Sequence, residues 1–202
     1  ASTEDSGDNG MQTRGSQFTR CMALARFLTS PESARVHLVA YLPASVEGHA
    51  VLPVLACAEI VAAPSAEIGR AAIDEPNDAT IESTYRVVAQ QRNTLPVAMV
   101  MSMLDPSREV HKAQTTDGDY KFVDQSEIGA LRKEGKVVSE SSIWTGGSLA
   151  TYTGQMLRNE LLIARTVSGL DELGPAVGIS SPLRAPRQLP DEWRPMMLTL
   201  TG

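Results

Sequence analysis

The run at 36–42, Val-His-Leu-Val-Ala-Tyr-Leu, constrains the fold of this chain more than any other part of the sequence. Its residues are β-branched or apolar on both faces of an extended chain, and Pro43 ends it. A strand with one solvated face alternates apolar and polar residues, whereas a strand of a parallel sheet is buried on both faces and does not alternate. The run therefore predicts a buried strand in a mostly parallel sheet, which places the chain in the α/β class.

The rest of the chain supplies the helices that such a sheet needs. Apolar residues recur at helical spacing in several stretches, with a capping residue or a proline near the first turn. These patterns predict helices over 17–28, 49–58, 80–92, 97–104, 126–133 and 153–165. A second short strand is expected at 60–63, and the turn at Asp117-Gly118 predicts a hairpin within 109–123.

Composition narrows the classes of function. Only 4% of the 202 residues are aromatic, so the core must be built from aliphatic side chains and methionine. A formal net charge of −6 gives nucleic acid no electrostatic reason to bind, and this class of partner is set aside. The sequence holds no run of about 18 apolar residues, which a membrane-spanning helix requires. The two cysteines, Cys21 and Cys57, lie in apolar patterns typical of core thiols.

Proline content marks a boundary near the end of the chain. We expect one domain over residues 1–178, from which a first strand is missing, and a proline-rich linker over 179–195. Residues 196–202 are expected to begin a further strand or domain. The polar, acidic start lacks both methionine and the features of a signal peptide, which indicates a piece of a larger protein.

The segment 39–69 resembles a known family. It contains a strand, a small-residue turn, an apolar helix ending in Ala-Cys-Ala-Glu-Ile, a short strand and a Pro-Ser-Ala-Glu-Ile-Gly turn. This order resembles the central signature of the ClpP/crotonase superfamily, and in particular the NfeD-like bacterial membrane serine proteases. Weaker likeness extends over about 6–174. The resemblance implies a spiral of ββα units with a mostly parallel sheet, self-association, and a place in the bacterial envelope through segments outside this chain.

The resemblance also implies where catalytic groups would lie. Active members place a nucleophilic serine at the start of the helix, where backbone amides from this turn and from a glycine-rich loop stabilise the oxyanion. Aligned without gaps between Tyr41 and Glu59, the family pattern puts glycine, Gly48, at the nucleophile position. The glycine-rich loop corresponds to residues 6–10, so Gly10, Gly48 and His49 become the oxyanion or binding candidates.

Two further catalytic positions are vacant. Where Clp proteases carry His-Gln-Pro, this chain has Asp74-Glu75-Pro76. Where NfeD-like enzymes carry their lysine, the helix after Asn93 contains none, and Met103 stands at the base position. A serine hydroxyl needs such a base to become nucleophilic. Three vacancies at matched positions predict that the ancestral chemistry has been lost.

Other residues offer alternative chemistry. Ser45 lies in the same loop as Gly48 and is an alternative nucleophile if the turn is shifted, and His49 is an alternative base or polarising donor. Their structural interpretations are a loop serine and a helix-start histidine bonded to a neighbouring carbonyl. The acidic cluster of Asp74, Glu75 and Asp78 lacks EF-hand spacing and is expected to be solvated. We expect neither a metal nor a cofactor.

Two hypotheses follow from these residues. The first is a ClpP/NfeD-like domain that has lost catalysis and binds a peptide, a protein or an acyl group, or serves assembly, in a larger envelope protein. The second is an active enzyme, either a serine peptidase using Ser45 or a crotonase-like acyl-CoA enzyme that relies on backbone oxyanion amides. Because fold alone does not fix function, the resemblance does not choose between them.

Overall fold

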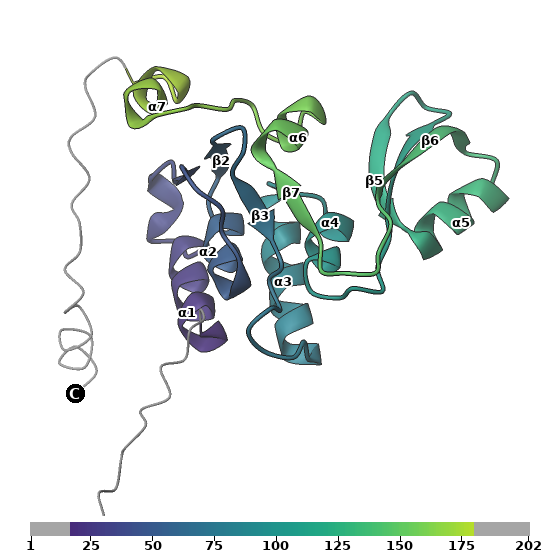
Figure 1. Cartoon of the computed structure of the whole chain (residues 1–202), viewed down its shortest axis with the longest axis horizontal. Helices are drawn as coiled ribbons and strands as arrows, with labels where there is room; N and C mark the ends of the chain where they lie inside the picture. Colours follow the sequence, from purple (N-terminus) through teal and green to yellow (C-terminus); the bar gives the residue numbers. More distant parts are fainter. Residues whose placement is uncertain (1–16, 180–202) are drawn as a thin grey trace, which may run out of the picture. The chain divides into compact units, whose positions relative to one another are not determined.

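The computed structural model describes residues 17–179, and the predictions for residues 1–16 and 180–202 lie outside this range. The chain separates into two compact units, the first ending at Ser168 and the second beginning at Gly169. The second unit contains the helix α7 (Leu170–Ala176). The first unit contains all the other described helices and strands (Figure 1).

Two parallel strands lie within the segment 39–69, which resembles the family signature. Strand β1 (Val39–Leu42) pairs in parallel with β2 (Glu59–Ala62), and the 3-10 turn η2 (Gly48–Ala50) and helix α2 (Val51–Leu55) connect them. The predicted strands at 36–42 and 60–63 are thus confirmed, with shorter bounds for the first. The helix predicted over 49–58 is shorter than expected, because it closes at Leu55 and the chain turns into β2.

Three further helices agree with their sequence patterns. Helix α1 (Phe18–Leu28) packs against α2, and α2 packs against α3 (Ala79–Arg92). Helix α3 packs in turn on α4 (Val97–Ser102), which follows Pro96. Asp78 caps α3, since its carboxylate accepts hydrogen bonds from two backbone amides of the first turn. A short 3-10 turn, η1 (Ser33–Arg35), lies between α1 and β1.

The predicted hairpin belongs to a three-stranded antiparallel sheet with the order β5-β4-β6. Strand β4 (Val110–Thr115) pairs with β5 (Tyr120–Asp124) on one side and β6 (Val137–Trp144) on the other. Helix α5 (Gln125–Lys133) connects β5 to β6 and buries Ile128 against Ala113 and Val123. The hairpin and α5 are confirmed, while β6 is a strand that the sequence patterns missed.

A close backbone approach joins two very short strands. Strand β3 (Glu67–Gly69) pairs antiparallel with β7 (Thr151–Thr153), and α6 (Gly154–Asn159) follows. A Cβ atom on Gly69 would overlap the carbonyl oxygen of Ala150, so glycine is required there. The helix predicted over 153–165 ends early, because Leu161 adopts a left-handed φ of 59°.

The pairing changes one prediction about the sheet. The α/β class is confirmed, but the described strands form small sheets of mixed pairing rather than one mostly parallel sheet. Only β1 and β2 form a parallel ladder among the described strands, and the other ladders are antiparallel. The prediction that the run at 36–42 is buried on both faces is wrong, because Val36 is exposed, residues 39–41 are half-buried and only Leu42 is buried.

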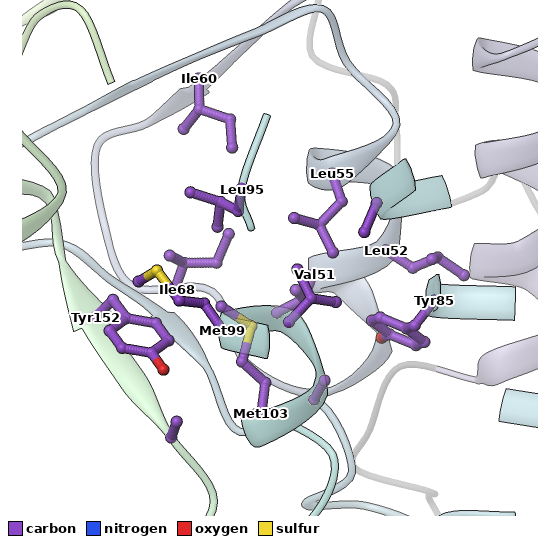
Figure 2. Close-up of a cluster of buried hydrophobic side chains, with 14 of the residues drawn as sticks. Val51, Leu52, Leu55, Ile60, Ile68, Tyr85, Leu95, Met99, Met103 and Tyr152 are labelled. Carbon is purple, nitrogen blue, oxygen red and sulfur yellow. The ribbon is translucent and has the colours of Figure 1, made fainter. Parts of the chain in front are cut away.

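The main core is aliphatic, with methionines and two tyrosines (Figure 2), and a second small cluster of Ala113, Val123 and Ile128 lies between α5 and its sheet. The largest fully buried side chains are those of Tyr85, Tyr152, Leu52, Leu55, Ile68, Leu95, Met99, Met101, Met103, Ile128, Leu157 and His49. His49 is the only member of this set that titrates near neutral pH. No helix of the described residues is long and apolar enough to cross a membrane.

Candidate functional site

Gly48 opens the turn η2 at the position where the family pattern places the nucleophile. It is buried, and its φ of 62° lies in the left-handed region that favours glycine. Its backbone amide donates a hydrogen bond of 3.1 Å to the carbonyl of Arg70. The position therefore offers no side chain, and its amide already has a partner.

The turn before Gly48 is tied to the segment around β3. The amide of Val46 donates to the carbonyl of Glu67 at 2.7 Å, and the amide of Gly69 donates back to Val46 at 3.2 Å. The Ser45 hydroxyl oxygen accepts a hydrogen bond of 3.0 Å from the Glu67 amide. Within residues 17–179, no histidine or lysine side chain hydrogen bonds to Ser45, so this alternative nucleophile has no base.

His49, the next residue, is the best-connected polar group of the core. Its ring is fully buried, and the ring of Phe18 from α1 packs edge-on against it at 5.1 Å between centroids. Nδ1 lies 3.1 Å from the hydroxyl of Tyr85 on α3. Nε2 lies 2.8 Å from Oε1 of Glu75, at an angle too poor for a full hydrogen bond. The imidazole thus connects a buried phenol to a carboxylate.

Burial decides the protonation state of this cluster. It lowers the pKa of His49, and the negative charges of Glu75 and Asp74 oppose this effect only in part. A carboxylate accepts but does not donate, so the proton of the neutral ring belongs on Nε2, facing Glu75. Nδ1 then accepts a hydrogen bond from the Tyr85 hydroxyl. The order carboxylate, imidazole, hydroxyl is the same as in hydrolytic triads.

The hydroxyl at the end of this series is not a usable nucleophile. Tyr85 is fully buried, and burial raises the pKa of its hydroxyl far above the ordinary value. Cys21 of α1 also belongs to this neighbourhood, and burial, followed by the charge of Glu75, raises the pKa of its thiol. Neither group is activated, and the cluster is closed by α1, so the arrangement holds a proton but does not present it to a substrate.

The two positions where the family carries a base, Asp74 and Met103, lie in different environments. Asp74 lies exposed in the loop before α3, close enough for its charge to influence His49. Met103 is fully buried at the end of α4 and belongs to the apolar core, as Figure 2 shows. Gly10, the remaining oxyanion candidate, lies outside the described residues. Of the predicted site residues, the fold thus brings Gly48 and His49 next to the loop that carries Asp74.

The other candidates have ordinary structural roles. The acidic cluster is divided, because Asp78 caps α3 while Glu75 faces His49. No group of three potential metal ligands is present among residues 17–179. His37 Nε2 and Glu59 Oε2 lie at hydrogen-bond distance, 3.0 Å, and both residues line a shallow hollow of about 480 Å³ at the amino ends of β1 and β2.

A second hollow of about 490 Å³ lies beside the loop that carries Glu75. Ala72, Asn77, Leu104 and Asp105 are among the residues that line it. The Oδ1 atom of Asn77 is buried and has no hydrogen-bond partner among the described residues.

Sequence reasoning found His49 but not its partners. Cys21 was expected to be a core thiol and is half-buried against the core, whereas Tyr85 is fully buried within it. Glu75 was expected to be solvated, yet its carboxylate reaches the buried ring. The contacts join positions 26 and 36 residues apart in the chain, and a single sequence holds no local signal for such pairs.

Comparisons with protein-family models, with curated proteins and with solved structures found no match to this chain. Membership of the ClpP/crotonase superfamily is therefore a proposal that rests on the resemblance of segment 39–69.

Proposed function

We propose that this chain is a ClpP/NfeD-like serine-protease-fold domain that has lost catalysis and that serves binding or assembly in a larger protein of the bacterial envelope. Its partner would be a peptide, a protein or an acyl group, or a second copy of itself. The proposal includes the finer fold, a spiral of ββα units. The parallel pairing of β1 with β2 through η2 and α2 supports one such unit.

The state of Gly48 carries this proposal. A nucleophile at the start of the helix needs a side chain, and an oxyanion site needs a free amide. Gly48 has no side chain, its left-handed φ of 62° favours glycine, and its amide is bonded to Arg70. Backbone geometry and hydrogen bonding thus both argue against an acyl-transfer site at this turn.

The neighbouring groups support the same conclusion. Met103, at the position of the NfeD-type lysine, is an apolar member of the core. His49 is adjacent to the vacancy, but its two ring nitrogens face Tyr85 and Glu75. In this orientation both ring nitrogens point at Tyr85 and Glu75, and no hydrogen bond joins the ring to Ser45.

Reaction with a fluorophosphonate probe tests the loss of peptidase chemistry. We expect no labelling and no peptide hydrolysis by the wild-type chain, by Ser45→Ala or by Gly48→Ser. The last variant restores a hydroxyl but no base, and it should cost about 1–2 kcal/mol of stability because serine is strained at this φ. Cleavage by the wild type that Ser45→Ala abolishes would show an active peptidase and overturn the proposal.

A thermal shift with acyl-CoA tests the crotonase alternative. That chemistry requires free oxyanion amides, and the Gly48 amide is engaged. We expect no turnover of the thioester, and a rise in melting temperature without turnover would identify an acyl group as the bound partner. A melting temperature that rises with acyl-CoA concentration, together with turnover of the thioester, would show a crotonase-like enzyme and overturn the proposal.

A further inference from the structure

Strand β6 is an open edge of the three-stranded sheet. It spans eight residues, and residues 138–142 in its middle are all exposed. Its only strand partner in the described part of the chain is β4. Among residues 17–179, no backbone hydrogen bond from outside the sheet reaches β6. One row of its amides and carbonyls is therefore unpaired.

This edge carries only some of the features that keep edges apart, namely a register shift near each end and one carboxylate. Proteins protect long edge strands with lysine, proline, bulges or short length. The sequence of β6, Val-Val-Ser-Glu-Ser-Ser-Ile-Trp, has neither lysine nor proline. Its register with β4 is irregular only near the two ends, so the stretch Ser139–Ser142 is regular. A strand of this kind is a template for another strand.

The single charge on β6 does not protect the edge either. Glu140 forms a salt bridge with Arg132 of α5, with its Oε2 2.8 Å from Nε. Helix α5 covers this face of the sheet, where Ala113 lies opposite Glu140 in the register. Ser139 and Ser141 stand on the other face, opposite Gln114 and Lys112. The charge of Glu140 is thus paired with that of Arg132, and the outer backbone amides and carbonyls of β6 are accessible to another strand.

We propose that β6 pairs antiparallel with β6 of a second copy of this chain, with Ser141 on the two-fold axis. The two three-stranded sheets then form one continuous sheet of six strands. Residues directly opposite one another in an antiparallel pair point to the same face. With Ser141 opposite itself, Glu140 lies opposite Ser142, Ser139 opposite Ile143, and Val138 opposite Trp144.

Charge and length select this register. A two-fold axis at Glu140 places two carboxylates directly opposite each other, and like charges in this position are destabilising. An axis at Ser139 or at Ser142 shortens the overlap to the five residues 137–141 or 140–144. An axis at Ser141 overlaps the seven residues 138–144 without opposing like charges. The strand is therefore most self-complementary about Ser141.

The inference rests on the proposed function in one respect, because it names the partner of an assembly domain. Its test is separate, since assembly is read from mass and cross-linking rather than from hydrolysis. A monomer would leave the loss of catalysis standing, and an active dimer would overturn the proposed function while leaving this pairing intact.

Sedimentation and disulfide trapping of the full chain test the pairing. We expect a concentration-dependent dimer in the wild type. Ser141→Lys should weaken it at least tenfold, because two ammonium groups then face each other across the axis. Ser83→Lys, an exposed change of equal charge on α3, is the matched control and should leave the dimer unchanged.

Cysteine variants test the register. On mild oxidation Ser141→Cys should form an intermolecular disulfide, since paired Cα atoms lie about 4.5–5.5 Å apart. Ser139→Cys should not, because its two copies would be about 13 Å apart along the strands. The wild type, with Cys21 and Cys57 only, gives the background. A monomeric wild type, including one that binds an extended peptide instead, overturns the proposal, as does cross-linking at 139 but not at 141.

Discussion

Two fully buried tyrosines lie at opposite sides of the same core in Figure 2, and their hydroxyl groups have different kinds of partner. Tyr152 of β7 shares a hydrogen bond of 2.7 Å with Ser102, whose hydroxyl also donates to the Met99 carbonyl at 2.7 Å. Tyr85 of α3 bonds to His49. Burial raises the pKa of both phenols far above the ordinary value, so neither ionises near neutral pH.

The two pairs differ in what the hydrogen-bond partner of each tyrosine contacts next. The Ser102 pair is neutral, satisfied and confined to the core. The His49 pair continues to Glu75 in the loop before α3, through a contact of 2.8 Å that is not a good hydrogen bond. Burial alone therefore does not mark a functional cluster. A link from the core to a half-exposed titratable group does, and it makes one tyrosine pair sensitive to pH and the other not.

Removal of His49 should have the largest effect on this comparison. His49→Ala leaves a cavity beside Phe18 and deprives the Tyr85 hydroxyl of its buried partner. We expect the free energy of unfolding to fall by about 3 kcal/mol. Urea unfolding followed by circular dichroism measures it. A loss below about 1 kcal/mol would mean that the ring is not packed and bonded as described.

Ser102→Ala should cost less, about 1–2 kcal/mol, because it removes a small group and takes one hydrogen-bond partner from the Tyr152 hydroxyl and one from the Met99 carbonyl. The loss should be the same at pH 5 and pH 8, since no group of this pair titrates in that range. A pH-dependent loss would contradict the distinction between the two tyrosine pairs. Ser83→Ala, at an exposed serine of α3, provides the control for a serine without a core partner.

Acid should destabilise the fold through His49. The pKa of His49 in the folded chain lies below its ordinary value of 6.5, whereas the unfolded chain has the ordinary value. As pH falls below 6.5, the unfolded state therefore binds the proton first, and stability decreases by up to about 1.4 kcal/mol per pH unit. The loss stops below the folded pKa. Unfolding curves of the wild type and His49→Gln between pH 8 and 4 isolate this contribution, which the variant should lack.

Local signals made much of the fold predictable. Asp78 and Asp124 each precede a helical pattern, and both carboxylates accept amide hydrogen bonds from the first turns of their helices. The hairpin at Asp117-Gly118 depends on a turn that glycine with positive φ supplies. In each case the residues that decide the structure lie within a few positions of one another.

The missed features depend on distant partners. Strand β6 is rich in serine and exposed, so it shows neither a buried run nor clear alternation, and its pairing with β4 creates it. For the same reason Gly48 and His49 were found from a contiguous segment, while Glu75 and Tyr85 were not assigned to the site. The order of strands in the sheets was also beyond the sequence patterns, because register between distant segments has no local signature.

The smallest expected effect separates the two carboxylates near His49. Glu75 contributes more than Asp74 to raising the pKa of the ring against burial, so Glu75→Gln should lower that pKa more than Asp74→Asn does. Stability at pH 7 should change by only a few tenths of a kcal/mol, because the Glu75 side chain is half exposed. The acid-dependent loss should extend to lower pH in Glu75→Gln, since the unfolded pKa is unchanged while the folded pKa falls.

Titration of the His49 ring resonances by NMR measures both shifts. A pKa that rises in Glu75→Gln, or shifts more in Asp74→Asn, would mean that the ring faces a different carboxylate from the one described, and the distinction from the Ser102 pair would then rest on burial alone.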